Sequence, residues 1–194
     1  MTETMLTRSL LGPSIVEIGE DQTHIVVENG LGFAAISTYG LENVDSVNEF
    51  CRFLGFNHSP RPNEYVSNMN TVLAWVRPGK WLVIGMESQV IEIAEHAKDF
   101  VGAIVLVTPL SNGRQSLCLF GIRVMDVLLS LSEFDFQSVD PDVKVAISTR
   151  FDEMHAFIQR LDDNNSWRII VDRCDADHAI KLLVESLKNV GSRM

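Results

Sequence analysis

The fold is most clearly indicated by residues 107–131, V-T-P-L-S-N-G-R-Q-S-L-C-L-F-G-I-R-V-M-D-V-L-L-S-L. This stretch begins with a cluster of Pro, Ser, Asn and Gly, which predicts a turn. Residues 115–120 then read as a strand, and Gly121 suits a tight turn where a side chain would obstruct the backbone. Apolar residues at helical spacing follow over residues 124–131. The stretch therefore predicts the order turn, strand, glycine, helix.

The same order occurs earlier in the chain. Residues 34–39 read as a strand, Gly40 follows them, and residues 44–54 carry an apolar helical stripe. Later in each half, Trp81 and Trp167 begin similar apolar runs, and each is followed at the same offset by another helical stripe. We therefore expect an α+β fold of two pseudo-repeated β-α-β-β-α halves with antiparallel sheets. The two tryptophans should occupy equivalent, buried places.

The repeat also defines the expected domain organisation. Residues 1–14 read as an N-terminal arm, and residues 15–194 as a single domain with pseudo-halves of about 22–107 and 108–190. Within it we expect three local features, namely a hairpin joining residues 23–27 to 32–38, a long loop over residues 57–70 and a strand over residues 103–107 that is buried on both faces.

The composition excludes several classes of function. With 46% hydrophobic residues the chain can bury a substantial core, and its net charge of −10 argues against binding to nucleic acid or an anionic membrane. No apolar run reaches the roughly 18 residues that a membrane-spanning helix needs. Residues 1–13 lack the apolar centre of a signal peptide. We therefore expect a soluble, cytoplasmic protein.

The ionisable side chains do not form a catalytic or metal-binding pattern. Asp175, Asp177 and His178 come closest to a metal cluster, but neighbours on a helix point about 100° apart. Glu153 and His155 share one face of a strand, where solvated polar residues are common. We therefore expect no catalytic residue and no metal on this chain.

Other residues that could carry chemistry have simpler explanations. The Gly30-Leu31-Gly32 pair lacks the third glycine and the following helix of a dinucleotide site. Cys51, Cys118 and Cys174 are far apart in sequence and lie in or beside apolar runs, so buried free thiols are expected.

The opening stretch is similar to a known family. A turn ending in S-N-G-R, a strand, a glycine and a helix rich in Val and Leu resemble the gamma subunit of heterotetrameric sarcosine oxidase, a small relative of the folate-binding aminomethyltransferase (glycine-cleavage T-protein) family. The resemblance covers roughly the whole chain and implies an aminomethyltransferase-like folate-binding domain fold. It also implies a complex that oxidatively demethylates sarcosine to glycine, with hydrogen peroxide and a one-carbon unit passed to tetrahydrofolate. FAD, FMN, NAD and tetrahydrofolate would bind to larger flavoprotein subunits, and no cofactor to this chain.

The chain departs from the transferases of that family at the position of their chemistry. In those enzymes an acidic residue on the hairpin after the second-half strand acts on the folate-bound one-carbon unit, and Phe157 or Ile158 takes its place here. Pro109 likewise stands where the relatives usually carry an acid. The resemblance thus predicts a non-catalytic subunit. The alternatives are a stand-alone folate-dependent aminomethyltransferase-like protein, the small subunit of a related N-methyl amino acid oxidase or dehydrogenase, and a homo-oligomeric scaffold.

Two apolar segments without periodicity are candidates for contacts with a partner subunit. Their residues are Met5, Leu6, Leu10 and Leu11 in the arm, and Tyr65, Val66 and Met69 in the long loop. A soluble protein of this size rarely exposes a large apolar patch. In the isolated chain these segments would fold back, pair in a homo-oligomer or stay mobile. In a complex, a larger subunit would cover them.

Overall fold

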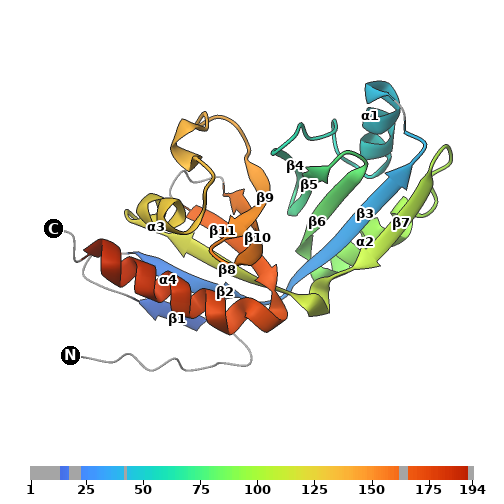
Figure 1. The fold of residues 1–194 in the computed structure, drawn as a ribbon. Coiled ribbons are helices and arrows are strands. Elements are labelled where there is room, and N and C mark those ends of the chain that lie inside the picture. Colours follow the sequence, from blue (N-terminus) through green and yellow to red (C-terminus); the bar gives the residue numbers. More distant parts are fainter. Residues whose placement is uncertain (1–13, 18–22, 42, 162–165, 192–194) are drawn as a thin grey trace. The chain divides into compact units, whose positions relative to one another are not determined.

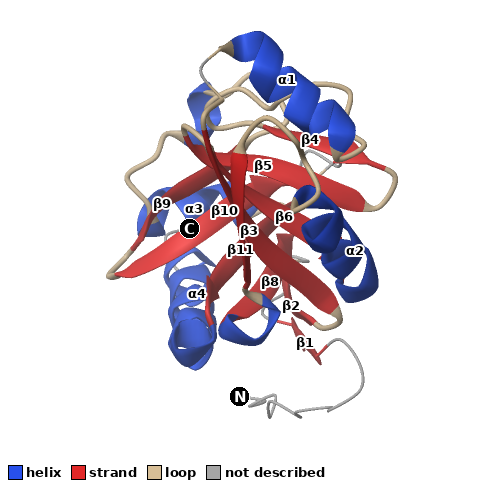
Figure 2. Ribbon diagram, turned by 90° about the vertical axis from the view of Figure 1, so that its right-hand side faces the viewer, coloured by secondary structure: helices blue, strands red, loops and turns tan. Residues whose placement is uncertain are grey.

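The computed structural model describes residues 14–17, 23–41, 43–161 and 166–191 (Figure 1). The chain divides into two compact units, of which the first comprises residues 1–29, 113–143 and 148–194 and the second residues 30–112 and 144–147. Each unit combines strands, red in Figure 2, with helices, blue in Figure 2. The expected α+β class with antiparallel sheets is confirmed.

The second unit contains a five-stranded sheet in the order β4-β5-β6-β3-β7. Its strands are β3 (Leu31–Tyr39), β4 (Tyr65–Asn68), β5 (Thr71–Arg77), β6 (Lys80–Met86) and β7 (Ile104–Pro109). Helices α1 (Val44–Phe53) and α2 (Glu87–Ala97) contribute Phe50 and Val90 to a core that also contains Ile36 and Trp81. Because side chains alternate along β3, Ile36 faces this core and its neighbours face the opposite side.

The first unit contains a six-stranded sheet in the order β1-β2-β8-β11-β10-β9. Its strands are β1 (Ser14–Glu17), β2 (His24–Glu28), β8 (Arg114–Phe120), β9 (Ala146–Phe151), β10 (Met154–Arg160) and β11 (Ser166–Asp172). Its helices are α3 (Val124–Leu131) and α4 (Ala176–Gly191). Leu117, Ile169, Val127 and Leu183 are completely buried in this unit, because the apolar stripes of both helices pack on the sheet.

The two units repeat one order of elements, as the sequence predicts. The second unit runs β3-α1-β4-β5-β6-α2, and the first runs β8-α3-β9-β10-β11-α4. The sheet orders β4-β5-β6-β3 and β9-β10-β11-β8 correspond as well. Each half has three strands between its helices, one more than expected. A further strand flanks the first strand of each repeat, with β7 beside β3 and β2 beside β8.

The predicted hairpin between residues 23–27 and 32–38 is wrong. β2 pairs with β1 and β8, whereas β3 pairs with β6 and β7 in the other sheet. The chain therefore changes sheets near Gly30 instead of turning back on itself. Two adjacent strand-like runs look the same in sequence whether they pair with each other or with distant strands, and here the distant pairing buries Ile25 completely.

Two other local predictions also need correction. The apolar run expected to be buried on both faces forms β7 at the edge of its sheet, where Ile104 is 69% and Leu106 55% exposed. The composition of the run shows that it is apolar, but it does not show whether the strand lies at the edge or in the middle of the sheet. The loop expected over residues 57–70 is shorter than predicted, because its last part forms β4. Met69 adopts a positive φ of 48° and permits a tight turn from β4 into β5.

The structure confirms the turn after each repeat's first strand. Gly40 and Gly121 have φ angles of 97° and 125°, a region that favours glycine. Trp81 and Trp167 are both buried, as expected. They are not strictly equivalent, however. Trp81 lies opposite a residue four positions before Gly40, and Trp167 opposite a residue two positions before Gly121.

Candidate functional site

A cluster of polar side chains spans four strands of the first unit. The Glu28 carboxylate accepts two hydrogen bonds from the Arg168 guanidinium, from Nε to Oε2 at 2.7 Å and from Nη2 to Oε1 at 2.9 Å. Ser116 Oγ donates to the same carboxylate at 2.5 Å, and Arg168 Nη1 donates to Gln159 Oε1 at 3.0 Å. Glu28 lies opposite Ser116, and Gln159 lies opposite Arg168. The strand register therefore brings these side chains together on one face of the sheet.

The electrostatics of this cluster favour a structural ion pair over a general base. Burial raises the pKa of the Glu28 carboxyl, but the hydrogen bonds and charge of Arg168, with the Ser116 hydrogen bond, lower it more. The net pKa lies below the ordinary value, so the group is ionised at neutral pH. A general base needs a pKa near the working pH and a lone pair directed at the substrate. Glu28 instead directs its oxygens at Arg168 and Ser116.

Phe157 and Ile158, the positions that the resemblance assigns to the acid of folate transferases, are buried apolar side chains. Phe157 is 8% exposed and Ile158 is completely buried. Phe157 shares the face of Gln159, and Ile158 faces the opposite side beside Ile169. Neither side chain offers a carboxylate to a folate-bound cation. Phe157 and Ile158 therefore do not fit the role of that acid.

The acidic and histidine residues singled out in the sequence lie on the surface. Asp177 and His178 are exposed near the start of α4, and Glu153 and His155 are exposed around the start of β10. Asp175 ends a 3₁₀ turn just before α4. Within the described part of the chain, no group of three or more His, Cys, Asp or Glu side chains is placed to hold a metal ion. That the protein binds no metal stays a prediction.

None of the three cysteines forms a disulfide, and they are not all buried. Cys51 lies in the core of the second unit, where burial raises the pKa of its thiol to about 12. It is therefore protonated and a poor nucleophile at neutral pH. Cys118 is half-buried and Cys174 is exposed, so the expectation of buried thiols is confirmed for Cys51 alone and is wrong for Cys174. The apolar neighbours of Cys174 belong to β11, which ends before it.

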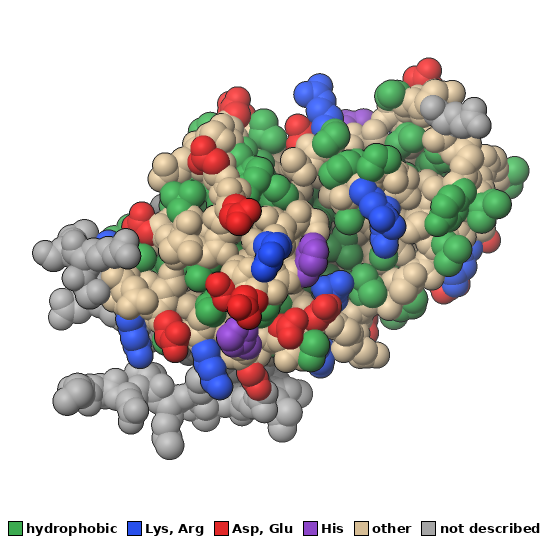
Figure 3. Space-filling model, in the orientation of Figure 1, with side chains coloured by type: hydrophobic (Ala, Val, Ile, Leu, Met, Phe, Trp, Pro, Cys, Tyr) green, Lys and Arg blue, Asp and Glu red, His purple; other side chains and the backbone are tan. Residues whose placement is uncertain are grey.

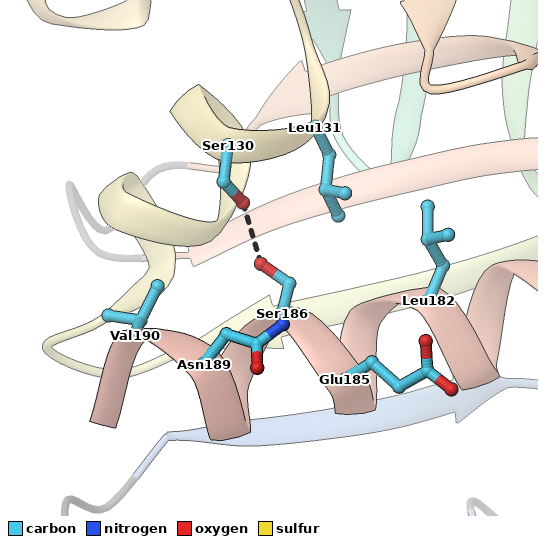
Figure 4. Close-up of a pocket in the computed structure, with 7 residues that line it drawn as sticks. All are labelled: Ser130, Leu131, Leu182, Glu185, Ser186, Asn189 and Val190. Carbon is cyan, nitrogen blue, oxygen red and sulfur yellow. Dashed lines mark hydrogen bonds between the residues drawn. The ribbon is translucent and has the colours of Figure 1, made fainter. Parts of the chain in front are cut away.

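A pocket of about 220 Å³ lies between α3 and α4 (Figure 4). Its lining consists of Ser130, Leu131, Leu182, Glu185, Ser186, Asn189 and Val190. Ser130 and Ser186 point toward one another, and their Oγ atoms are 2.6 Å apart. No lining residue is a histidine that could activate either hydroxyl. The volume is also below the roughly 300 Å³ at which small-molecule sites begin. The pocket therefore does not define an active site.

The candidate interface residues have different surroundings. Met5, Leu6, Leu10 and Leu11 lie outside the described residues. In β4, Tyr65 is 5% exposed, Lys144 Nζ lies 5.6 Å from its ring centroid, and Val66 packs on the core. Met69, in contrast, is 94% exposed. Two of the three loop residues, Tyr65 and Val66, thus pack within their own unit. Contact of the seven candidate residues with a partner subunit stays a prediction.

Sequence reasoning missed two features. Glu28 and Arg168 are 140 residues apart, and no local pattern connects them. The exposed apolar surface of β7 was mistaken for core, although Pro109 gave a signal. Proline has no backbone N–H to donate to a neighbouring strand and is therefore typical of an edge strand.

The fold and this site define a class of protein. It is an α+β chain with two repeated sheet-and-helix units, in which the cluster around Glu28 and Arg168 is a structural ion pair. A family profile described as the sarcosine oxidase, gamma subunit family matches residues 52–187. The chain belongs to this family, and the resemblance seen in the sequence is confirmed.

Two solved structures share the fold. A heterotetrameric sarcosine oxidase from Corynebacterium sp. U-96, in complex with pyrrole 2-carboxylate, has a chain that is 17% identical, with a TM-score of 0.72 over 89% of this chain and 87% of that one. The glycine cleavage system aminomethyltransferase T from Bartonella henselae is 13% identical, with a TM-score of 0.58 over 81% of this chain and 44% of that one. At these identities the likeness establishes the fold alone.

Two further results are negative. No curated protein sequence matches the chain. Among the described residues, no helix is both long enough and apolar enough to cross a membrane.

Proposed function

We propose that this chain is the non-catalytic gamma subunit of a cytoplasmic sarcosine oxidase complex. The observation that carries the proposal is the family match over residues 52–187, which includes parts of both units. The complex would oxidatively demethylate sarcosine to glycine, with hydrogen peroxide and a one-carbon unit passed to tetrahydrofolate as the other products. Larger flavoprotein subunits would bind FAD, FMN, NAD and tetrahydrofolate. Cysteines that form no disulfide, like the three in this chain, are typical of a reducing compartment.

The chemistry of the described residues supports a docking role for this chain. Glu28 is ionised and held by Arg168, and the two residues that the resemblance assigns to the transferase acid, Phe157 and Ile158, are apolar and buried. The most deeply buried thiol, Cys51, is protonated at neutral pH. These groups cannot accept the protons or balance the cationic charge that oxidation and transfer of an N-methyl group generate.

Isolation of the tagged full-length chain from its own source tests this function. Flavoprotein subunits should co-purify in a fixed ratio, and the isolate should produce hydrogen peroxide when sarcosine is added. A chain that is recovered without a flavoprotein, from cells that oxidise sarcosine, would contradict the proposal. Other N-methyl amino acids, tested in the same assay, would reveal a related oxidase.

Calorimetry separates the proposal from the stand-alone transferase. Tetrahydrofolate titrated into the isolated chain should give no binding in the micromolar range, because the positions that the resemblance assigns to the transferase acid, Phe157 and Ile158, are apolar and buried. Micromolar binding, together with aminomethyl transfer by the chain alone, would favour the transferase.

A further inference from the structure

The outer strand of the second unit's sheet presents an apolar surface. β7 pairs with β3 on one side, and no other described strand pairs with its second side. Ile104 and Leu106 are 69% and 55% exposed, and Tyr39, opposite Ile104, is 61% exposed. Val101, just before the strand, is 93% exposed. We call Tyr39, Val101, Ile104 and Leu106 the β7 patch. On the right of Figure 3, hydrophobic side chains gather over this part of the sheet.

The backbone of β7 is suited to accept another strand. The Leu110 N–H donates to the Phe33 carbonyl at 2.8 Å, so Leu110 directs its backbone toward β3. Because backbone directions alternate in an antiparallel ladder, Val105 and Val107 direct their N–H and C=O groups toward the open edge. Pro109 also points outward, where its missing N–H does not weaken the pairing with β3. β7 contains no charged residue, although charges commonly protect a free edge.

The first unit shows how the equivalent edge is covered. His24 of β2 lies opposite Phe120, just before Gly121, in the same way that Ile104 of β7 lies opposite Tyr39, just before Gly40. β2 therefore corresponds to β7.

On its outer side, β2 carries β1 as an antiparallel strand. β1 covers His24 to Val27. The corresponding stretch of β7 is residues 104–107, which includes both outward-facing valines. The second unit thus has a position for a strand that its own described residues leave open.

We propose that another subunit of the oxidase adds an antiparallel strand to β7 over residues 104–107. This inference rests on the proposed function, because the family places the chain beside other subunits. Main-chain hydrogen bonds to Val105 and Val107 would hold the strand. Alternate apolar side chains of that strand would cover Ile104 and Leu106, since side chains at alternate positions share a face. The partner segment is therefore extended, apolar at alternate positions and free of proline at its paired residues.

A charge-introducing double substitution tests the surface. The tagged full-length chain carrying Ile104→Lys and Leu106→Lys should recover at least about tenfold less of the flavoprotein subunits than wild type, because two charges would be buried at the contact. Its melting temperature should stay near wild type, since both side chains are exposed in the chain itself. Ile91→Lys is the matched control, since Ile91 of α2 is also apolar and 55% exposed in the second unit, and it should assemble normally.

Residue-resolved hydrogen exchange tests the added strand itself. In the wild-type complex the amides of Val105 and Val107 should gain protection relative to the isolated chain, whereas those of Ile104 and Leu106 are already protected by β3. Undiminished assembly of the double variant, or no gain at Val105 and Val107, would overturn the inference while leaving the proposed function intact.

Two other outcomes would also overturn the inference. Wild-type chain that recovers no flavoprotein would remove the proposed function and this inference together. In the second outcome, the wild-type chain forms a homodimer, the double variant is monomeric, and the flavoprotein still assembles normally with it. The β7 patch would then be a contact between copies of this chain.

Discussion

Replacement of Glu28 by Gln should destabilise the protein strongly. The substitution leaves the Arg168 guanidinium, whose side chain is only 14% exposed, without its counter-charge. Removal of one partner from a buried ion pair typically costs about 3–5 kcal/mol. Both side chains keep some exposure, 14% and 21%, and Gln159 still accepts one hydrogen bond from Arg168. We therefore expect a loss near the lower end, about 3 kcal/mol in the free energy of unfolding.

Urea unfolding, followed by far-ultraviolet circular dichroism, measures this loss. Glu153→Gln provides a matched control, because Glu153 is exposed and its substitution should change stability by less than about 0.5 kcal/mol. Replacement of Glu28 by Leu together with Arg168 by Met should cost less than Glu28→Gln alone, since no charge is left unpaired.

The pH dependence gives an independent check. The pKa of Glu28 is lowered in the folded state, so its contribution is fully present above the unfolded-state pKa of about 4.3. The contribution is lost as the pH falls through the folded-state pKa. The difference in stability between wild type and Glu28→Gln should therefore shrink below about pH 4. A loss below about 1 kcal/mol at neutral pH, or a difference that grows in acid, would refute this reasoning.

Three other predictions concern single residues. Trp167→Ala should lower the free energy of unfolding by about 3–5 kcal/mol because the indole is 1% exposed, and a loss under about 1 kcal/mol in urea unfolding would be inconsistent with core packing. Gly121→Ala should cost about 1–3 kcal/mol, since φ is 125°, whereas Gly113→Ala, whose Cβ would meet no atom within 4 Å, should be nearly neutral; equal melting temperatures would contradict the turn argument. Cys174 should react with a thiol reagent in the native protein and Cys51 only after unfolding, so rapid native labelling of Cys51 would disprove its burial.

Features that depend on local patterns could be predicted from the sequence. Gly40 and Gly121 mark turns because the strand-to-helix connection needs a positive φ, and the apolar stripes of residues 44–54 and 124–131 identify helices. The repeat of these signals gave the two-unit architecture and led to the family.

Features that depend on distant pairing could not be predicted in this way. β2 looked like one arm of a hairpin with β3, since neither sequence carries information about which strand it joins. The apolar composition of β7 is the same for an edge and a central strand, and only Pro109 distinguishes the two. Glu28 and Arg168 meet only after the three strands β2, β8 and β11 have aligned.

Whether this chain is a subunit of sarcosine oxidase is best tested by starting from the enzyme activity and not from this chain. Sarcosine oxidase should be purified from the protein's source by following hydrogen peroxide formation on sarcosine, and its polypeptides identified by quantitative mass spectrometry. The account predicts that peptides of this chain are present in a constant ratio to the flavoprotein subunits across the active fractions. An oxidase that keeps full activity through purification and contains no peptide of this chain would contradict it.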